Sequence, residues 1–386
     1  MMNQGNLSRR GFIDRSVSTL AVAGLPLWYA RRIVAEEVQK EDDAKKPVAA
    51  TDKLRLGQIG CGGQGTGITK AALRHKGVEL VAVCDVDKSR REKIAKELGG
   101  DRDVKTYNDF RDLVARDDID IVTIGTPDHW HAMTAVAAMK AGKDVYCEKP
   151  LTLYLTEGQT MVKVARSTGK VLQTGSQQRS DKRFRLACEL VRNGRIGKIR
   201  TVEARIGDNP VGGPFKTAPV PEGLDWDMWQ GQTPQVEYIP ERCHYEFRWW
   251  REYSGGKSTD WGAHHNDIAQ WGLGMDGSGP VSVEAKGDTT PNDGKSYNFP
   301  KHFKITYTYA NGAELITKSN GENGVIFEGE NGWIFVSRGR IEASNKKLLD
   351  EPLADNAQKL QVSNDHMGNF LDCVKDRQRP ICDALA

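Results

Sequence analysis

The sequence predicts an α/β protein with two domains: a doubly wound parallel sheet, then an α/β domain with an open, mainly antiparallel sheet. From Leu54 onward, short apolar runs alternate with helical stretches, which is typical of a parallel sheet covered by helices. After about residue 176 the apolar runs become rich in β-branched and aromatic residues, and Asn-Gly pairs interrupt them. Such pairs are hairpin signals, so the second sheet is expected to be mainly antiparallel.

Length and composition agree with this organisation. The 386 residues suffice for two domains, and 38% hydrophobic with 28% charged residues is typical of a globular protein. The 55 basic and 52 acidic residues form no long block of one sign, so nothing indicates a nucleic-acid partner. The 7 cysteines include no C-x-x-C pair, which predicts buried, reduced thiols rather than a disulfide framework.

Residues 1–52 are predicted to be an export signal followed by a linker. Ser8, Arg9 and Arg10 precede Phe12 and an apolar run of the length of a signal h-region, too short for a membrane span. This pattern is similar to the twin-arginine signal, which predicts the twin-arginine export machinery as a partner and a periplasmic location, with membrane tethering if the signal stays uncleaved. The charged, mixed segment 31–52 is expected to be a linker outside the fold, and the VAA at 48–50 is a weak cleavage candidate.

The first domain is expected to cover residues 53–175. Its strands are predicted over 54–60, 78–85, 119–127 and 144–150, and its helices over 66–75, 89–99 and 131–143. These strands are apolar on both faces, as strands covered by helices on both sides should be.

The second domain is expected to cover residues 176–386 and to carry the substrate and oligomer contacts. A helix is predicted between Ser180 as N-cap and Gly194 just beyond its end. Strands follow over 198–206, 281–287, 302–319 and 324–338, with hairpin turns at Asn311-Gly312 and Asn331-Gly332.

The turn after the first strand carries a G-x-G-x-x-G motif, and Asp85 ends the next strand. Together these features predict a Rossmann domain that binds a dinucleotide, because the glycines let a pyrophosphate approach the N-terminus of a helix. Asp85 would accept the ribose hydroxyls, which favours NAD over NADP, although Lys88 and Arg90 leave NADP open. The expected cofactor contacts in the turn are Gly60, Gly62, Gly63, Gln64 and Gly65.

Two further motifs follow strand ends: TPDHWH at 126–131 and EKP at 148–150. With the glycine turn and a later D-x-G-x-H at 260–264, they make residues 54–380 resemble the Gfo/Idh/MocA oxidoreductase family, named for glucose-fructose oxidoreductase and inositol dehydrogenase. The resemblance implies that Lys149 lies beside the nicotinamide and takes part in proton transfer. The remaining expected cofactor contacts are Thr126, Pro127, His129, His131, Glu148, Lys149 and Gln177.

Asp260 and His264 are four residues apart, which puts them on one face if the segment is helical. Asp260 would then orient His264 or bind substrate hydroxyls itself, and the resemblance makes His264 the general base. The alternative is a helix-capping Asp260 with exposed histidines, and a metal site built with His265 and Asp267 is conceivable but not assigned. The expected substrate contacts are Lys149, Arg179, Trp249, Asp260, His264 and His265.

The resemblance implies NAD-dependent oxidation of a secondary hydroxyl on a sugar, polyol or glycoside, with Lys149 and His264 sharing proton transfer and Asp260 assisting. One alternative is a redox-neutral glycosidase, lyase or epimerase, and another is a non-catalytic sugar-binding protein. Export favours a tightly bound cofactor, because free NAD is scarce outside the cytoplasm. Of six tryptophans between Leu224 and Trp271, one or two are expected in the substrate pocket.

The resemblance also implies a homo-oligomer, either a dimer or a tetramer. Family members usually continue past the RPICD-like segment with a further helix, whereas this sequence ends at Ala386. A truncated end or a different final packing is therefore expected.

Overall fold

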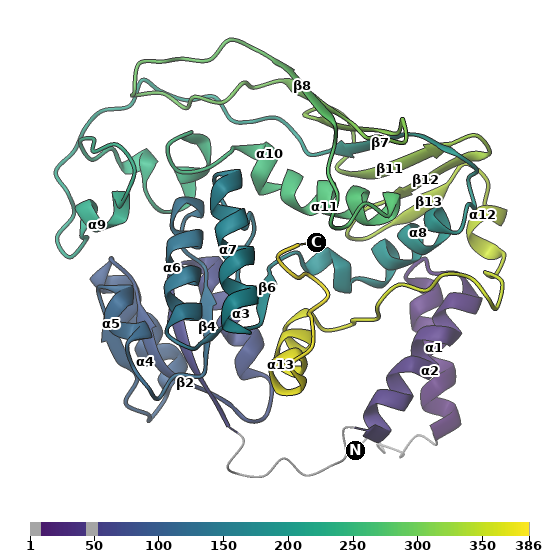
Figure 1. The fold of residues 1–386 in the computed structure, drawn as a ribbon, viewed down its shortest axis with the longest axis horizontal. Coiled ribbons are helices and arrows are strands. Elements are labelled where there is room, and N and C mark those ends of the chain that lie inside the picture. Colours follow the sequence, from purple (N-terminus) through teal and green to yellow (C-terminus); the bar gives the residue numbers. More distant parts are fainter. Residues whose placement is uncertain (1–8, 44–52, 386) are drawn as a thin grey trace, which may run out of the picture.

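The computed structural model describes residues 9–43 and 53–385, which form two sheets with their helices and an N-terminal pair of helices (Figure 1). The first sheet has six parallel strands in the order β3-β2-β1-β4-β5-β6, which is the doubly wound Rossmann arrangement. Its strands are β1 Leu54–Ile59, β2 Val78–Cys84, β3 Lys105–Tyr107, β4 Ile121–Ile124, β5 Asp144–Cys147 and β6 Leu172–Thr174. The predicted parallel-sheet domain is confirmed.

Helices cover both faces of this sheet, so its strands are apolar on both sides, as predicted. One face packs on α3 (Gly63–Leu73) and α4 (Lys88–Gly99), the other on α5 (Phe110–Val114), α6 (Asp128–Lys140) and α7 (Leu155–Thr168). Near the end of the chain, α13 (His366–Asp376) returns to the first sheet, where Phe370 is fully buried beside α3 and Tyr146.

The second sheet has seven strands in the order β13-β12-β11-β7-β10-β9-β8. Only β7 and β10 pair in parallel, so the sheet is mixed but mostly antiparallel, as predicted. Its strands are β7 Ile199–Arg205, β8 Ser282–Gly287, β9 Phe303–Thr308, β10 Glu314–Lys318, β11 Gly324–Gly329, β12 Gly332–Val336 and β13 Ile341–Ala343. Both predicted Asn-Gly hairpins are present, between β9 and β10 and between β11 and β12.

Two helices, α8 (Lys182–Arg192) and α11 (Gly262–Leu273), pack against this sheet, and α12 (Lys347–Asp350) follows β13. The predicted end of α8 is confirmed by Gly194, whose φ is 73°. Its cap differs from the prediction: Asp181 rather than Ser180 accepts the hydrogen bond, 2.8 Å from the amide of Arg183. A carboxylate one residue nearer the helix reaches that amide better than the serine hydroxyl does.

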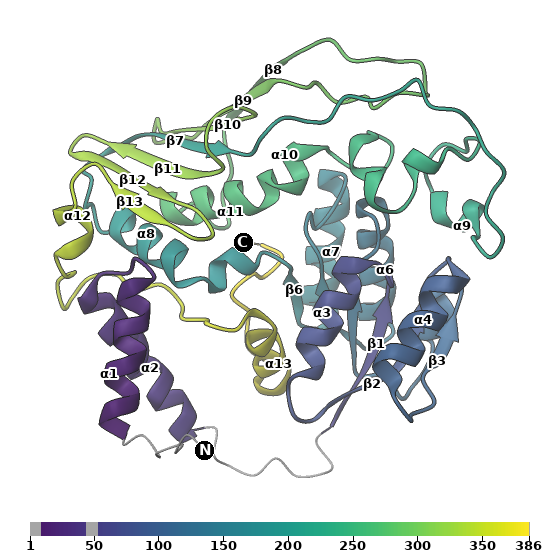
Figure 2. The ribbon, with the colours of Figure 1, turned by 180° about the vertical axis from the view of Figure 1, so that it is seen from behind.

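The helices α1 (Arg9–Val22) and α2 (Leu27–Asp43) lie side by side against the second domain (Figure 2). The side chains of Tyr29 and Ile33 are fully buried in the core of that domain. Residues 31–43 therefore belong to the fold, whereas the sequence analysis placed them in a linker. Their charged side chains have partners far along the chain: Arg32 lies 2.8 Å from Glu189, whose side chain is buried.

The predicted export motif is only partly described. Ser8 and residues 44–52, with the VAA at 48–50, lie outside the described residues, and so do the side chains of Arg9, Arg10 and Phe12. None of the helices within 9–43 and 53–385 is long and apolar enough to cross a membrane.

The connection between β7 and β8 crosses from the second domain to the far end of the first one (Figure 1). Before α11 it contains four short helical segments and much extended chain, and it passes close to α6. The four segments are α9 (Trp226–Gln230), η2 (Pro240–Arg242), η3 (His244–Trp249) and α10 (Lys257–Asp260).

Candidate active site

A cavity of about 1350 Å³ lies at the carboxyl ends of the first sheet and is lined by residues from both domains. Open α/β sheets bind ligands at this edge, where the strand order reverses between β1 and β4. The volume of about 1350 Å³ exceeds the ~300–1,000 Å³ of an ordinary ligand pocket, so the cavity is larger than one small ligand needs.

One side of the glycine turn packs closely against other backbone atoms, and its other side is open toward this cavity. A Cβ on Gly65 would lie 2.0 Å from the carbonyl oxygen of Gly60, and a Cβ on Gly125 would lie 2.5 Å from Cα of Gly65. By contrast, a Cβ on Gly63 would meet nothing within 4 Å, and Gly62 also lines the cavity. The turn therefore presents the free amides of the α3 N-terminus to the cavity, which suits a pyrophosphate.

Asp85 lies at the end of β2 and lines the same cavity. Its carboxylate accepts hydrogen bonds from the amides of Cys61 (2.7 Å) and Asp87 (2.9 Å). Burial raises the pKa of Asp85, and these two amides oppose the shift. The amides hold the carboxylate in place, and its remaining lone pairs can accept ribose hydroxyls.

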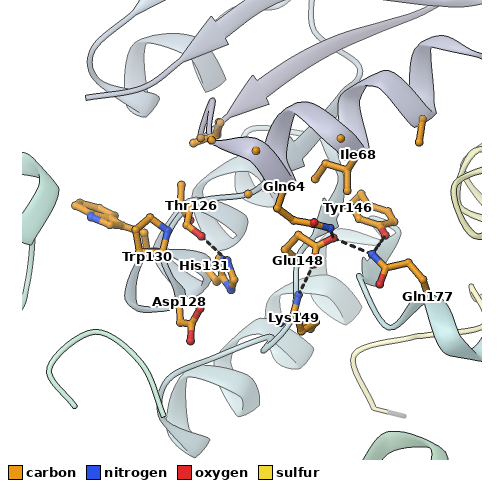
Figure 3. Close-up of a pocket in the computed structure, with 18 of the residues that line it drawn as sticks. Gln64, Ile68, Thr126, Asp128, Trp130, His131, Tyr146, Glu148, Lys149 and Gln177 are labelled. Carbon is orange, nitrogen blue, oxygen red and sulfur yellow. Dashed lines mark hydrogen bonds between the residues drawn. The ribbon is translucent and has the colours of Figure 1, made fainter. Parts of the chain in front are cut away.

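A polar network centred on the buried Glu148 joins the start of α3 to the loop after β6 (Figure 3). One oxygen of Glu148 accepts hydrogen bonds from the side-chain amides of Gln64 and Gln177, each at 2.9 Å, and Gln177 also reaches the hydroxyl of Tyr146 at 3.2 Å. Burial raises the pKa of Glu148, while the bond from Gln64 opposes the shift. The network fixes the floor of the cavity next to Lys149.

Lys149 forms an ion pair with Asp260 across the domain boundary. Its Nζ lies 2.8 Å from Oδ1 of Asp260 and 3.0 Å from the carbonyl oxygen of the same residue. Burial alone would raise the pKa of Asp260, but the charge and hydrogen bond of Lys149 hold it below its ordinary value. Arg248 approaches the same carboxylate oxygen at 3.4 Å.

His264 lies in the first turn of α11 and lines the cavity near this pair. Burial and the positive charges of Lys149 and Arg338 lower its pKa to about 2, so the imidazole is neutral at ordinary pH. Its Nδ1 is buried without a hydrogen-bond partner among the described residues. A neutral imidazole can accept a proton. Asp260 was expected to orient His264 or to bind substrate hydroxyls, whereas in the structure its carboxylate pairs with Lys149.

Asp128 is a cavity residue that the sequence analysis passed over. It is the first residue of α6, it is 5% exposed, and the hydroxyl of Ser254 donates to it at 2.5 Å. Burial raises the pKa of Asp128 to about 7, although Lys149 and Arg248 oppose the shift. The signal was available, because Asp128 follows Pro127 at the carboxyl end of a parallel strand.

His131 lines the cavity, as do Thr126 and Pro127, but its ring nitrogens face the protein. Its Nδ1 lies 2.7 Å from the carbonyl oxygen of Pro150, and its Nε2 lies 3.0 Å from that of Thr126. His131 therefore ties the loop after β4 to the loop after β5 and supports the position of Lys149.

Two other histidines predicted at the site lie away from the cavity lining. His129 is buried below the connection between the domains, with its Nε2 3.0 Å from the carbonyl oxygen of Trp229. His265 is buried against the second sheet, with its Nε2 3.0 Å from the side chain of Asn323. Both have protein partners and support the fold.

Arg179 and Trp249, predicted to contact substrate, are also turned away from the cavity. Arg179 is buried and bonds to the carboxylates of Asp267 and Asp276. The indole of Trp249 is buried and donates to Glu246 at 2.5 Å. Of the tryptophans between Leu224 and Trp271, the cavity is lined by Trp229 and Trp261.

Within the described parts of the chain, no group of three or more His, Cys, Asp or Glu side chains is arranged to hold a metal ion. The 7 cysteines are all free and buried, as the sequence predicts.

Comparison with known families agrees with both domains. Residues 54–176 match the NAD-binding Rossmann fold of the Gfo/Idh/MocA oxidoreductases, and residues 212–383 match a C-terminal α/β domain of that family. The chain belongs to the Gfo/Idh/MocA oxidoreductase family. Its first domain is thus an NAD-binding domain, and the glycine turn, Asp85 and Lys149 occupy that domain's cavity.

Among curated Gfo/Idh/MocA relatives, an inositol 2-dehydrogenase of Salmonella typhimurium is 33% identical over 154 residues, which is 39% of this chain and 45% of that protein. A glycosyl hydrolase family 109 protein of Shewanella baltica is 32% identical over 211 residues, or 52% of this chain and 46% of that protein. The chain thus matches somewhat less than half the length of these relatives.

Solved structures share the fold over most of the chain. Aldose-aldose oxidoreductase from Caulobacter crescentus, complexed with glycerol, has a TM-score of 0.64 at 21% identity, covering 86% of this chain and 92% of that one. The WlbA dehydrogenase from Bordetella pertussis, in complex with NADH and UDP-GlcNAcA, has a TM-score of 0.62 at 21% identity, covering 86% and 91%.

Proposed function

We propose that this protein is an NAD-dependent oxidoreductase that acts on a secondary hydroxyl of a sugar, polyol or glycoside. The observation that carries the proposal is the convergence of the Lys149–Asp260 pair, the neutral His264 and the glycine turn on one cavity. When bound there, NAD supplies the hydride acceptor.

Lys149 and His264 have separate roles in the proposed proton transfer. Lys149, paired with Asp260, offers N–H donors to the reacting hydroxyl oxygen. His264 lines the same cavity with its Nδ1 unpartnered among the described residues, and it accepts the hydroxyl proton while hydride leaves the carbon. One hydroxyl proton and one hydride leave the substrate, and a ketone forms.

The test is to incubate the purified protein with NAD and a panel of myo-inositol, free aldoses and p-nitrophenyl glycosides. We expect NADH absorbance and a ketone product with at least one member of the panel. His264→Asn and Lys149→Met should abolish both signals while NAD still binds. NADH formation that survives both changes would contradict the proposed roles.

A redox-neutral reaction is the second candidate, favoured by Asp128. Hydride transfer from a hydroxyl needs one base, whereas elimination beside the new carbonyl also needs a group that moves a second proton. Asp128 lines the cavity and, with a pKa of about 7, is suited to that work. The relative named for glycosyl hydrolase family 109 matches half of this chain. Release of p-nitrophenol with no added NAD or acceptor would favour this candidate over the dehydrogenase.

NAD is proposed as the cofactor in preference to NADP, because the half-buried carboxylate of Asp85, which lines the cavity, would repel a 2′-phosphate. Fluorescence titration with NADH and NADPH tests this, and equal affinity for the two would contradict it.

Export and self-association remain proposals that rest on separate features. The paired Arg9 and Arg10 favour export by the twin-arginine machinery, and Arg9→Lys with Arg10→Lys should leave the protein in the cytoplasm.

Every residue of β8 is exposed at the edge of the second sheet, and Val281 and Val283 are 68% and 58% exposed. A homo-oligomer built on this edge should be visible by sedimentation, and Val283→Lys should dissociate it.

A further inference from the structure

The second domain covers one end of the cofactor site. Residues 223–250, here called the clasp, belong to the connection that crosses to the first domain, and they pack against the loop after β2 (Figure 2). In the sheet order β3-β2-β1-β4-β5, Lys149 follows β5, whereas Asp85 ends β2. Because Asp85 would mark the adenosine ribose and Lys149 the nicotinamide, the part of the clasp that is bonded to the loops after β2 and β3 lies at the adenosine end. Arg248, at the other end of the clasp, lies 3.4 Å from Asp260 and therefore at the nicotinamide end.

Backbone hydrogen bonds attach the clasp to the loop after β2. The amide of Lys88 donates to the carbonyl oxygen of Gly223 at 2.9 Å, and the amide of Asp225 donates to that of Val86 at 3.1 Å. Asp87 and Leu224 form an isolated antiparallel bridge between the same segments. This loop begins immediately after Asp85.

Side chains add a second set of attachments. The side-chain amide of Asn108, just after β3, donates to Asp225 at 2.8 Å, and Asp225 also caps α9. His244 lies 3.3 Å from the carboxylate of Asp87. The indole of Trp130 donates to the carbonyl oxygen of Trp229 at 3.0 Å.

The clasp has an apolar core of its own and presents part of it to the cavity. Trp226 and Trp229 stack with ring centroids 4.8 Å apart, and Arg242 lies 3.9 Å above the ring of Trp250. The clasp residues that line the cavity are Met228, Trp229, His244, Tyr245, Phe247 and Arg248. Met228 lies beside Asn108 and His244 beside Asp87, at the Asp85 end, where a thioether and an imidazole suit the apolar faces of an adenine ring. Tyr245 and Phe247 pack against Arg248, which is at the Lys149 end.

We propose that the clasp completes an adenosine subsite of the cofactor site and must open for NAD to enter or leave. The inference rests on the proposed function in taking NAD as the ligand and in placing its nicotinamide beside Lys149. NAD held in this way stays bound from one turnover to the next, so its release is slow and is set by the clasp.

A disulfide across the clasp tests the need for opening. A Cβ on Gly223 would lie 3.3 Å from Cβ of Lys88, close to the ~3.5–4.5 Å of a disulfide, and both residues are exposed. The variant Lys88→Cys with Gly223→Cys is loaded with NAD and oxidised, and retained NAD is followed during gel filtration. We expect release at least tenfold slower than in the wild type, with the wild-type rate restored by dithiothreitol.

Controls separate the clasp from other effects. Gly223→Cys alone measures the strain of a side chain at φ +84° and should not slow release. Asn108→Asp places a second carboxylate next to that of Asp225 and should speed NAD release about tenfold. Adding Asp225→Asn removes the repulsion and should restore the wild-type release rate.

The outcomes are distinguishable. The proposal would be overturned if the oxidised Lys88→Cys, Gly223→Cys variant released NAD as fast as the wild type. It would also be overturned if adding Asp225→Asn to Asn108→Asp did not restore the wild-type release rate. Wild-type protein that binds no NAD at all would instead contradict the proposed function.

Discussion

The substitution Asp128→Asn should change how stability depends on pH. In the folded protein, burial raises the pKa of Asp128 from 3.8 to about 7; the hydrogen bond from Ser254 and the charges of Lys149 and Arg248 oppose the shift. The pKa difference of about 3 corresponds to about 4 kcal/mol of unfolding free energy. The folded chain holds the proton more tightly, so this stabilisation is fully present below about pH 4 and is lost as pH rises through 7.

Asparagine keeps the shape of Asp128 and can still accept from Ser254, but it cannot ionise. We therefore expect the variant to gain unfolding free energy relative to wild type as pH rises from about 4 to 8, by up to about 4 kcal/mol. Urea unfolding at about pH 4, 6 and 8 measures the gain. A difference that stays constant across this range would refute the buried, protonated carboxyl. Ser254→Ala is the matched control, because it removes the hydrogen bond and leaves the carboxyl.

Three further substitutions test other parts of the structure. Lys149→Met should lower turnover about 10²–10⁴-fold with bound NAD retained, measured by single-turnover kinetics; equal loss of NAD would point to a binding role. Gly65→Ala should weaken NAD binding at least tenfold by fluorescence titration, because its Cβ would lie 2.0 Å from the Gly60 oxygen; unchanged affinity would contradict the close-packed turn. Ile33→Ala, at a fully buried position, should cost about 2–5 kcal/mol in urea unfolding, whereas Leu27→Ala, 51% exposed, should cost little; similar costs would contradict the docking of α2.

The sequence predicted the order of the elements and the residues that meet at the strand ends. The glycine turn, Lys149, Asp260 and His264 are far apart along the chain, yet they line one cavity. This was predictable because the carboxyl ends of parallel strands share one edge of the sheet, and the family resemblance added the residues of the second domain.

His129 and His265 were predicted at the site, and the phase of their helices turns them away from the cavity. The first helical residue of α6 is Asp128, so Asp128 and His131 share a face, whereas His129 is turned by about 100° toward Trp229. His265 follows His264 in α11 and is turned away in the same manner. The spacing of Asp128, His129 and His131 can be read from the sequence, but the sequence does not reveal the residue at which α6 begins.

Long-range partners explain the rest. Arg179 was predicted to contact a ligand, but its guanidinium bonds to the carboxylates of Asp267 and Asp276. These partners follow it by roughly 90 residues, so the local sequence does not reveal them. The clasp and the docking of α2 depend in the same way on contacts between distant segments, for which local pattern carries no signal.

The docking of α2 also orders events during synthesis. Tyr29 and Ile33 leave the ribosome early, but the core that buries them includes Val325, Phe327 and Val336. At the usual ~5–20 residues per second, the interval between these segments is roughly 15–60 s. During that time α1 and α2 have been synthesised, but the strands that complete the core around Tyr29 and Ile33 have not. A receptor that reads the first residues of the nascent chain therefore competes with folding only after most of the protein has been translated.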